Sequence, residues 1–186
     1  MDATLRTLGR FVLLAALLGG AFFVFSRVRA DYRVRGKLSR PNAILQVGFF
    51  CGYALSSYAF LDSRLSQVNT ATVLFPVALA LMILGFLAVV WSMPFLGKRS
   101  FGQEIGALRT TALYRFSPNP QLVGGFLYVV GYAMLWPSWM GAMWASLWPI
   151  VAHLMVQGEE EHLEMVFGDQ YREYCKHTPR YLGLPK

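Results

Sequence analysis

The sequence predicts an all-α fold, an integral membrane bundle of about five transmembrane helices followed by a cytoplasmic C-terminal helix. Of its 186 residues, 55% are hydrophobic and only 15% are charged, whereas soluble domains are close to one-quarter charged. The apolar residues also gather in long runs, and about 20 such residues suffice to cross the hydrocarbon core. The length suits one domain, residues 1–186, with spans one to three in 1–97 and a more polar part in 98–186.

The apolar runs give the expected spans in chain order: Leu8–Ser26, Ala43–Leu61, Val73–Leu96, Leu122–Trp136 and Met140–Val156. The first run follows Arg6 and Arg10, as the core of a signal peptide would. No small-x-small cleavage site comes after it, so a retained anchor is expected. The last two runs are short, and a tight turn at Pro137 separates them.

Basic residues concentrate on one side of these spans. The segments after spans one, three and five hold Arg27, Arg29, Arg33, Arg35, Lys37, Arg40, Lys98, Arg99, Arg109, Arg115, Arg172, Lys176, Arg180 and Lys186. Of the 17 lysines and arginines, only Arg6, Arg10 and Arg64 fall on the other side. Because Lys and Arg favour cytoplasmic loops, we expect an outside N-terminus and a cytoplasmic C-terminus in a bacterial or archaeal inner membrane.

This topology has two consequences for function. The loop Lys98–Pro120 and the tail from Gln157 onward fall on the same face, so these polar segments can meet. It also accounts for the net charge of +7, and we expect no nucleic-acid partner. Cys51 and Cys175 have no partner at metal-ligand spacing, and we expect no metal.

The first polar segment runs into the fourth span through two prolines. Pro118 and Pro120 fix their own backbone, and each disfavours helix in the residue before it. Asn119 is therefore held in a non-helical entry, where it can cap the span or face a ligand. A proline-punctuated loop with a helix cap is the structural alternative.

The second polar segment continues out of the fifth span. At 100° per residue, one helical stripe carries His153, Gln157, Glu160 and Glu164. An ionisable group such as His153 is costly inside a span and is by default a functional candidate. Glu159 points about 100° away from Glu160, so the two side chains cannot both address one atom. A solvated helix face is the alternative for these carboxylates.

Taken together, the two segments resemble the isoprenylcysteine carboxyl methyltransferase and phospholipid methyltransferase family of integral membrane enzymes. The first family element is matched by Tyr114, Arg115, Asn119, Pro120 and Gly124. The C-terminal element is matched in register by Glu159, Glu160, Leu163, Phe167, Gly168, Tyr171, Tyr174, Arg180 and Pro185. The resemblance covers residues 101–186. Pro118 stands where the family usually has Arg, and Leu122 where it usually has Tyr.

The resemblance implies methyl transfer from S-adenosylmethionine to a lipophilic or membrane-associated acceptor: a prenylcysteine carboxylate, a phospholipid amine or a small thiol. The residues expected to bind the cofactor are Tyr114, Arg115, Asn119, Pro120, Gly124, His153, Glu159, Glu160 and Tyr171. Arg180 is the expected catalytic residue, because its fork can orient a carboxylate or phosphate. The alternative for Arg180 is an anchor that reaches lipid phosphates.

Three other functions fit parts of the pattern. Some membrane sterol reductases share a similar C-terminal half and use a nicotinamide cofactor, although this chain is small for one. A non-enzymatic membrane scaffold would need none of the paired motifs. A transporter would need charged or broken helices at mid-membrane, and His153 alone supports that weakly.

Overall fold

The computed structural model describes residues 3–61, 68–100, 108 and 110–184, with no side-chain detail for Ala3 and residues 93–100. Arg64, Arg109, Pro185 and Lys186, and the side chains of Lys98 and Arg99, lie outside this description. No strand occurs in the described part, so the predicted all-α fold is confirmed.

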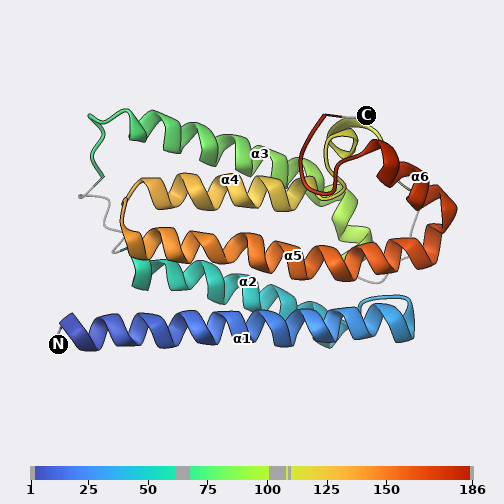
Figure 1. Ribbon diagram of the computed structural model, residues 1–186, viewed down its shortest axis with the longest axis horizontal. Coiled ribbons are helices and arrows are strands. Elements are labelled where there is room, and N and C mark those ends of the chain that lie inside the picture. Colours follow the sequence, from blue (N-terminus) through green and yellow to red (C-terminus); the bar gives the residue numbers. More distant parts are fainter. Residues whose placement is uncertain (1–2, 62–67, 101–107, 109, 185–186) are drawn as a thin grey trace.

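The long helices run side by side (Figure 1). They are α1 (Ala3–Arg35), α2 (Arg40–Leu61), α3 (Leu74–Ser100), α4 (Pro120–Met134) and α5 (Trp139–Phe167). A 3-10 turn, η2 (Ala112–Arg115), and a short helix, α6 (Asp169–His177), lie together at one end of this bundle (Figure 1). Helix α5 packs against α1, α2 and α4, while α3 packs on α4.

The expectation of about five transmembrane helices needs one correction. Within the described residues, α1, α2, α3 and α5 are long and apolar enough to cross a membrane. Helix α4 has 15 residues and rises about 22 Å at 1.5 Å per residue, short of the roughly 30 Å hydrocarbon core. The apolar run misled the expectation because it continues past α4 into the turn at Trp136. The protein is a helical membrane bundle in which α4 begins part-way along its neighbours.

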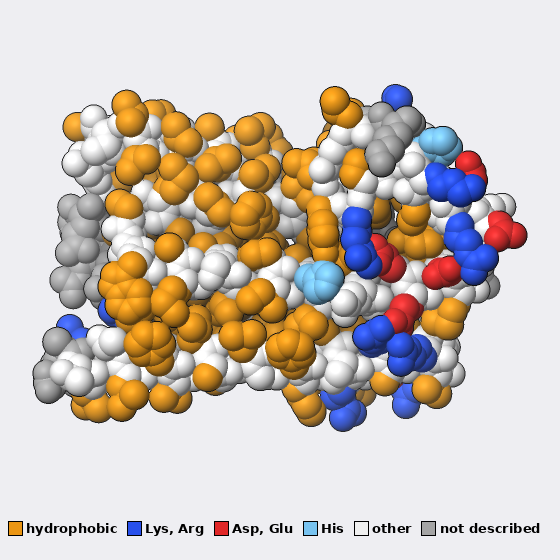
Figure 2. Space-filling view, in the orientation of Figure 1, with side chains coloured by type: hydrophobic (Ala, Val, Ile, Leu, Met, Phe, Trp, Pro, Cys, Tyr) orange, Lys and Arg blue, Asp and Glu red, His pale blue; other side chains and the backbone are white. Residues whose placement is uncertain are grey.

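Two helices are longer than a membrane requires. Helices α1 and α5 have 33 and 29 residues, which give lengths of about 50 Å and 43 Å. Their polar ends therefore extend past the hydrocarbon core on one side. Figure 2 shows the acidic side chains and most of the basic ones on this view gathered at that end, while hydrophobic side chains cover the rest.

Aromatic packing joins α2 to α5 in the core. The rings of Tyr53 and Trp144 stack with centroids 4.8 Å apart. Their polar atoms are also satisfied: the Tyr53 hydroxyl donates to the carbonyl of Trp144 at 3.0 Å, and the indole nitrogen donates to Ser56 Oγ at 2.9 Å. Buried Tyr and Trp need such partners, so this contact fixes how far α2 and α5 slide along each other.

Helices α3 and α4 approach so closely that two glycines touch. A Cβ on Gly124 would lie 2.7 Å from the carbonyl oxygen of Gly85, and a Cβ on Gly85 would lie 2.4 Å from that of Gly124. Small residues allow such contact between membrane helices. The start of α4 is thereby held against α3.

Helix α5 ends in a sharp turn at Gly168. This residue has φ +52° and ψ −122°, a conformation that glycine adopts at little cost and other residues avoid. The turn reverses the chain, so that α6 packs back on α5 through Leu163, Tyr171 and Tyr174.

Candidate functional site

The two polar segments that the sequence singled out lie against each other. The Tyr174 hydroxyl of α6 donates to the carbonyl oxygen of Tyr114 in η2 at 2.6 Å. Farther along the tail, the amide of Gly183 donates to the carbonyl oxygen of Phe116 at 3.2 Å. The expected meeting of these segments, 60 or more residues apart in sequence, is confirmed.

The Asn-Pro element forms a buried, non-helical entry to α4. Ser117 is 1% exposed and Asn119 is 5% exposed, and the Asn119 amide nitrogen receives a hydrogen bond from no farther than Ser117 Oγ, at 3.1 Å. The Asn119 side chain does not cap α4. Non-helical backbone at membrane depth is tolerated where protein buries it, and here the C-terminal tail provides the cover.

The depth of this entry follows from its neighbours on α5. Leu122, in the first turn of α4, clusters with Val151, Ala152 and Met155, and its carbonyl oxygen accepts from the Trp148 indole at 3.0 Å. The beginning of α4 is therefore level with the part of α5 that carries His153. Because α4 is short, a recess lies between its first turn and the longer polar end of α5.

The predicted stripe on α5 is the face on which the tail lies. Arg180 Nε donates to Glu160 Oε1 at 2.8 Å, and a second bond joins Nη2 to Oε2. Two turns deeper, His153 Nδ1 is hydrogen-bonded to the Tyr181 hydroxyl. On the stripe itself, Gln157 Nε2 lies 2.9 Å from His153 Nε2. The dipeptide Arg180-Tyr181 thus spans two positions on α5.

The neighbouring carboxylates serve different partners. Glu161 accepts from Arg29 Nε at 2.8 Å and from Arg33 Nε at 2.9 Å, so two arginines of α1 hold it. His162 stacks on Tyr32 of α1 with ring centroids 4.4 Å apart. Glu159 is half-buried on an adjoining face. The ion pairs with α1 fix the rotation of α5, which leaves Glu160 directed toward the tail.

Two buried polar atoms near the recess lack a hydrogen-bond partner among the described residues: Gln121 Oε1 and the Tyr171 hydroxyl oxygen. Burial raises the pKa of the Tyr171 hydroxyl, and the neighbouring Cys175 and Glu160 raise it further. Tyr171 therefore keeps its proton at neutral pH and can donate it. Unsatisfied buried groups are costly, so an acceptor and a donor here suit a polar ligand with complementary groups.

Other predicted residues are placed differently. Arg115 is exposed, and Tyr114 is buried with its carbonyl taken by Tyr174. Gly124 faces α3, where the contact with Gly85 accounts for a glycine. Their roles at a cofactor stay predictions. Sequence reasoning missed Gln121, although a polar residue in the first turn of an apolar helix is a usable signal.

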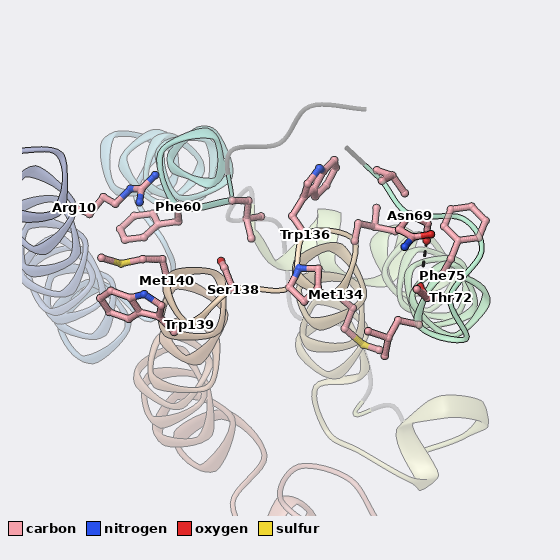
Figure 3. A pocket seen from close by; sticks show the side chains of 15 residues that line it. Arg10, Phe60, Asn69, Thr72, Phe75, Met134, Trp136, Ser138, Trp139 and Met140 are labelled. Carbon is pink, nitrogen blue, oxygen red and sulfur yellow. Dashed lines mark hydrogen bonds between the residues drawn. The ribbon is translucent and has the colours of Figure 1, made fainter. Parts of the chain in front are cut away.

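A cavity of about 500 Å³ lies at the opposite end of the bundle, near the turn between α4 and α5 (Figure 3). Its polar groups bond within the wall: Asn69 Oδ1 accepts from the Ala71 amide, the Thr72 hydroxyl donates to the Asn69 carbonyl, and Arg10 Nε donates to the Ala59 carbonyl. Helix α5 begins at this end and reaches Glu160 about 32 Å away. The cavity is therefore separate from the recess.

No group of His, Cys, Asp and Glu side chains able to hold a metal ion occurs among the residues that the structure describes. Cys51 and Cys175 are both exposed free thiols.

Comparison with known proteins gives one match. The sequence profile described as phospholipid methyltransferase matches residues 73–170, from α3 to the start of α6. No curated protein and no solved structure matches the chain. The matched range contains the Asn-Pro element and Glu160. It ends before Tyr171 and Arg180.

Proposed function

The chain belongs to the phospholipid methyltransferase family, and we propose that it transfers a methyl group from S-adenosylmethionine to the headgroup of a membrane lipid. The observation that carries the proposal is the convergence of Asn119 with the Glu160–Arg180 pair at one end of the bundle. The family description favours a phospholipid amine as acceptor. A prenylcysteine carboxylate and a small thiol are the alternatives to be assayed beside it.

The donor groups in the recess suit the proposed cofactor. Glu160 offers a carboxylate for an ammonium group or a ribose diol, and Gln121 Oε1 offers an unused acceptor. The protonated Tyr171 hydroxyl offers a donor. When bound, S-adenosylmethionine supplies an electrophilic methyl group on a sulfonium. The chain's part is then positioning and electrostatics, which lower the barrier of an in-line displacement without a covalent nucleophile.

Arg180 is suited to hold the acceptor. Its guanidinium pairs with Glu160 through two bonds, yet half of its side chain is exposed, so it can turn toward a phosphate or carboxylate. Hydrogen bonding with Glu160 raises its pKa, and it stays charged. Exposed apolar side chains surround it: Phe116 on the loop, and Leu182 and Leu184 on the tail. An arginine within an apolar rim matches an amphiphile with an anionic headgroup.

Sidedness completes the proposal. The recess, the arginines of α1 and the tail share one end, and we place that end in the cytoplasm, where S-adenosylmethionine is made. A reporter fused after Arg35 should then be cytoplasmic, and one inserted at Asn69 should be external.

Titration of the purified protein in detergent with S-adenosylhomocysteine and, separately, with a reduced nicotinamide dinucleotide tests the proposal. Methyltransferase function predicts saturable binding of the first ligand alone. Binding of the nicotinamide alone would identify a reductase, and binding of neither would leave a scaffold.

A further inference from the structure

The hydrogen-bonded pair His153–Tyr181 lies beside the recess and has no part in the account of cofactor and headgroup binding above. His153 is on α5, level with the start of α4, and Tyr181 follows Arg180 in the tail. An imidazole at this depth in a membrane helix is costly unless function requires it. Its chemistry therefore calls for an explanation.

Both ring nitrogens of His153 have partners. The amide nitrogen of Gln157 lies 2.9 Å from Nε2 and can only donate. In this arrangement Nε2 accepts, Nδ1 carries the hydrogen, and Nδ1 donates to the Tyr181 oxygen. A half-turn of the Gln157 amide presents its oxygen instead. Then Nε2–H donates to Gln157 Oε1, and Nδ1 accepts from the Tyr181 hydroxyl.

The same two partners also satisfy the charged ring. An imidazolium donates from both nitrogens, one bond going to Gln157 Oε1 and the other to the Tyr181 oxygen. His153 can thus gain and lose a proton with every hydrogen bond retained. A purely structural histidine needs only one of these states.

We propose that His153, acting through the Tyr181 hydroxyl, accepts the proton that an ammonium headgroup must lose before it can be methylated. This inference rests on the proposed function and deepens it, because it selects an acceptor that carries a proton on its nucleophilic atom. An amine fits this description. A carboxylate acceptor is already deprotonated at neutral pH and needs no such group.

The proton and electron balance is as follows. A proton leaves the ammonium nitrogen for the Tyr181 oxygen while the Tyr181 proton moves to His153 Nδ1. The freed lone pair on nitrogen forms a bond to the methyl carbon, and the carbon–sulfur bond breaks with its electron pair going to sulfur. The sulfonium becomes a neutral thioether, and the methylated nitrogen carries the positive charge. His153 then returns its proton to water at the membrane surface.

Few ionisable groups face His153 in the described part of the chain. Tyr181 contacts it directly, while Arg180 and Glu160 pair with each other two turns away. The arginines of α1 that reach α5 are held by Glu161. On α6, Tyr171 and Cys175 lie toward Glu160. The first turn of α4 contributes Gln121, which does not titrate.

The test uses the full chain in vesicles of phosphatidylethanolamine, with S-adenosylmethionine as donor, and measures initial rates from pH 5.5 to 9.5. Histidine changes charge between about pH 5 and 8, so the parent rate should fall across that range as the pH is lowered. His153→Gln should lower the rate at pH 7 at least tenfold. Its deficit should shrink to within about threefold at pH 9.5, where solution base deprotonates the amine.

Two further variants separate proton transfer from structure. Tyr181→Phe keeps the ring and removes the hydroxyl, and it should show the same pH-dependent deficit. His177→Gln is the matched control, because His177 is an exposed histidine of α6 that pairs with Glu173. It should keep the parent profile.

The opposing outcomes are distinct. A His153→Gln deficit that is constant from pH 6 to 9.5, or parental rates in Tyr181→Phe, would overturn the proton-transfer role. A parent that binds S-adenosylhomocysteine but methylates no phosphatidylethanolamine would overturn the amine acceptor. Absence of S-adenosylhomocysteine binding in the parent would instead overturn the proposed function on which the inference rests.

Discussion

The hydroxyl of Tyr174 donates a 2.6 Å hydrogen bond to the carbonyl oxygen of Tyr114, across 60 residues of sequence. Both residues are buried, and the bond ties α6 to the loop that leads into α4. The Tyr114 carbonyl belongs to η2 and makes this contact in place of a continued helix. This bond therefore holds together the two halves of the candidate site.

Replacement of Tyr174 by Phe should loosen that junction. The change removes the hydroxyl and leaves a buried carbonyl without its partner, which costs about 1–3 kcal/mol of stability. A lower midpoint of thermal unfolding in detergent would show it. Tyr58→Phe is the control, since Tyr58 is exposed on α2 and its loss should leave the midpoint unchanged. Equal midpoints for both variants would mean that the bond contributes nothing.

Gly124→Ala should destabilise the protein, because the new methyl would lie 2.7 Å from a backbone oxygen of α3. Overpacking of this kind costs about 1–3 kcal/mol. Gly48→Ala is the matched control, since a Cβ there meets nothing within 4 Å. Unfolding measured by loss of helical signal should distinguish the pair, and an unaffected Gly124→Ala would show that α3 and α4 separate readily.

Glu160→Gln and Asn119→Ala should each weaken S-adenosylhomocysteine binding by about 1–3 kcal/mol, as expected when a charged or buried hydrogen bond is lost. Calorimetric titration measures this directly. Without ligand, Glu160→Gln should change stability by less than about 1 kcal/mol, because its partner Arg180 is half exposed and such pairs contribute little. Glu164→Gln, on the same stripe but paired with exposed Arg172, should bind as the parent does. Parental affinity in both test variants would move the site elsewhere.

Arg180→Lys separates an acceptor clamp from a membrane anchor. An anchor tolerates Lys, whereas a two-bond guanidinium contact does not. We expect expression, membrane insertion and S-adenosylhomocysteine affinity to be kept. Methyl transfer should fall tenfold or more, about 1.4 kcal/mol. The matched control is Arg172→Lys, an exposed pair partner on α6. Near-parental turnover in Arg180→Lys would return Arg180 to the anchor class.

Much of this arrangement follows from the sequence. Hydropathy located the apolar helices, and the 100° spacing placed His153, Gln157, Glu160 and Glu164 on one face, as the contacts of the tail show. The length of α4 was wrong because apolar composition does not distinguish a helix from an apolar turn. Its true start at Pro120 depends on local backbone geometry.

The partners of that face were beyond sequence reasoning. The tail after His177 has no periodic pattern, so nothing in the sequence indicates that Arg180 meets Glu160 while Tyr181 meets His153. Likewise, Arg29 and Arg33 read as topology signals, and their bonds to Glu161 depend on how α1 packs against α5. Such contacts between distant segments are fixed by tertiary packing alone.

The location of the cofactor is the central claim, and photo-crosslinking with methyl-labelled S-adenosylmethionine followed by peptide mapping tests it most directly. The account predicts that label, competed away by S-adenosylhomocysteine, appears in peptides from residues 110–122 or 153–184. Label in residues 134–140, which line the cavity at the opposite end of the bundle, would contradict it.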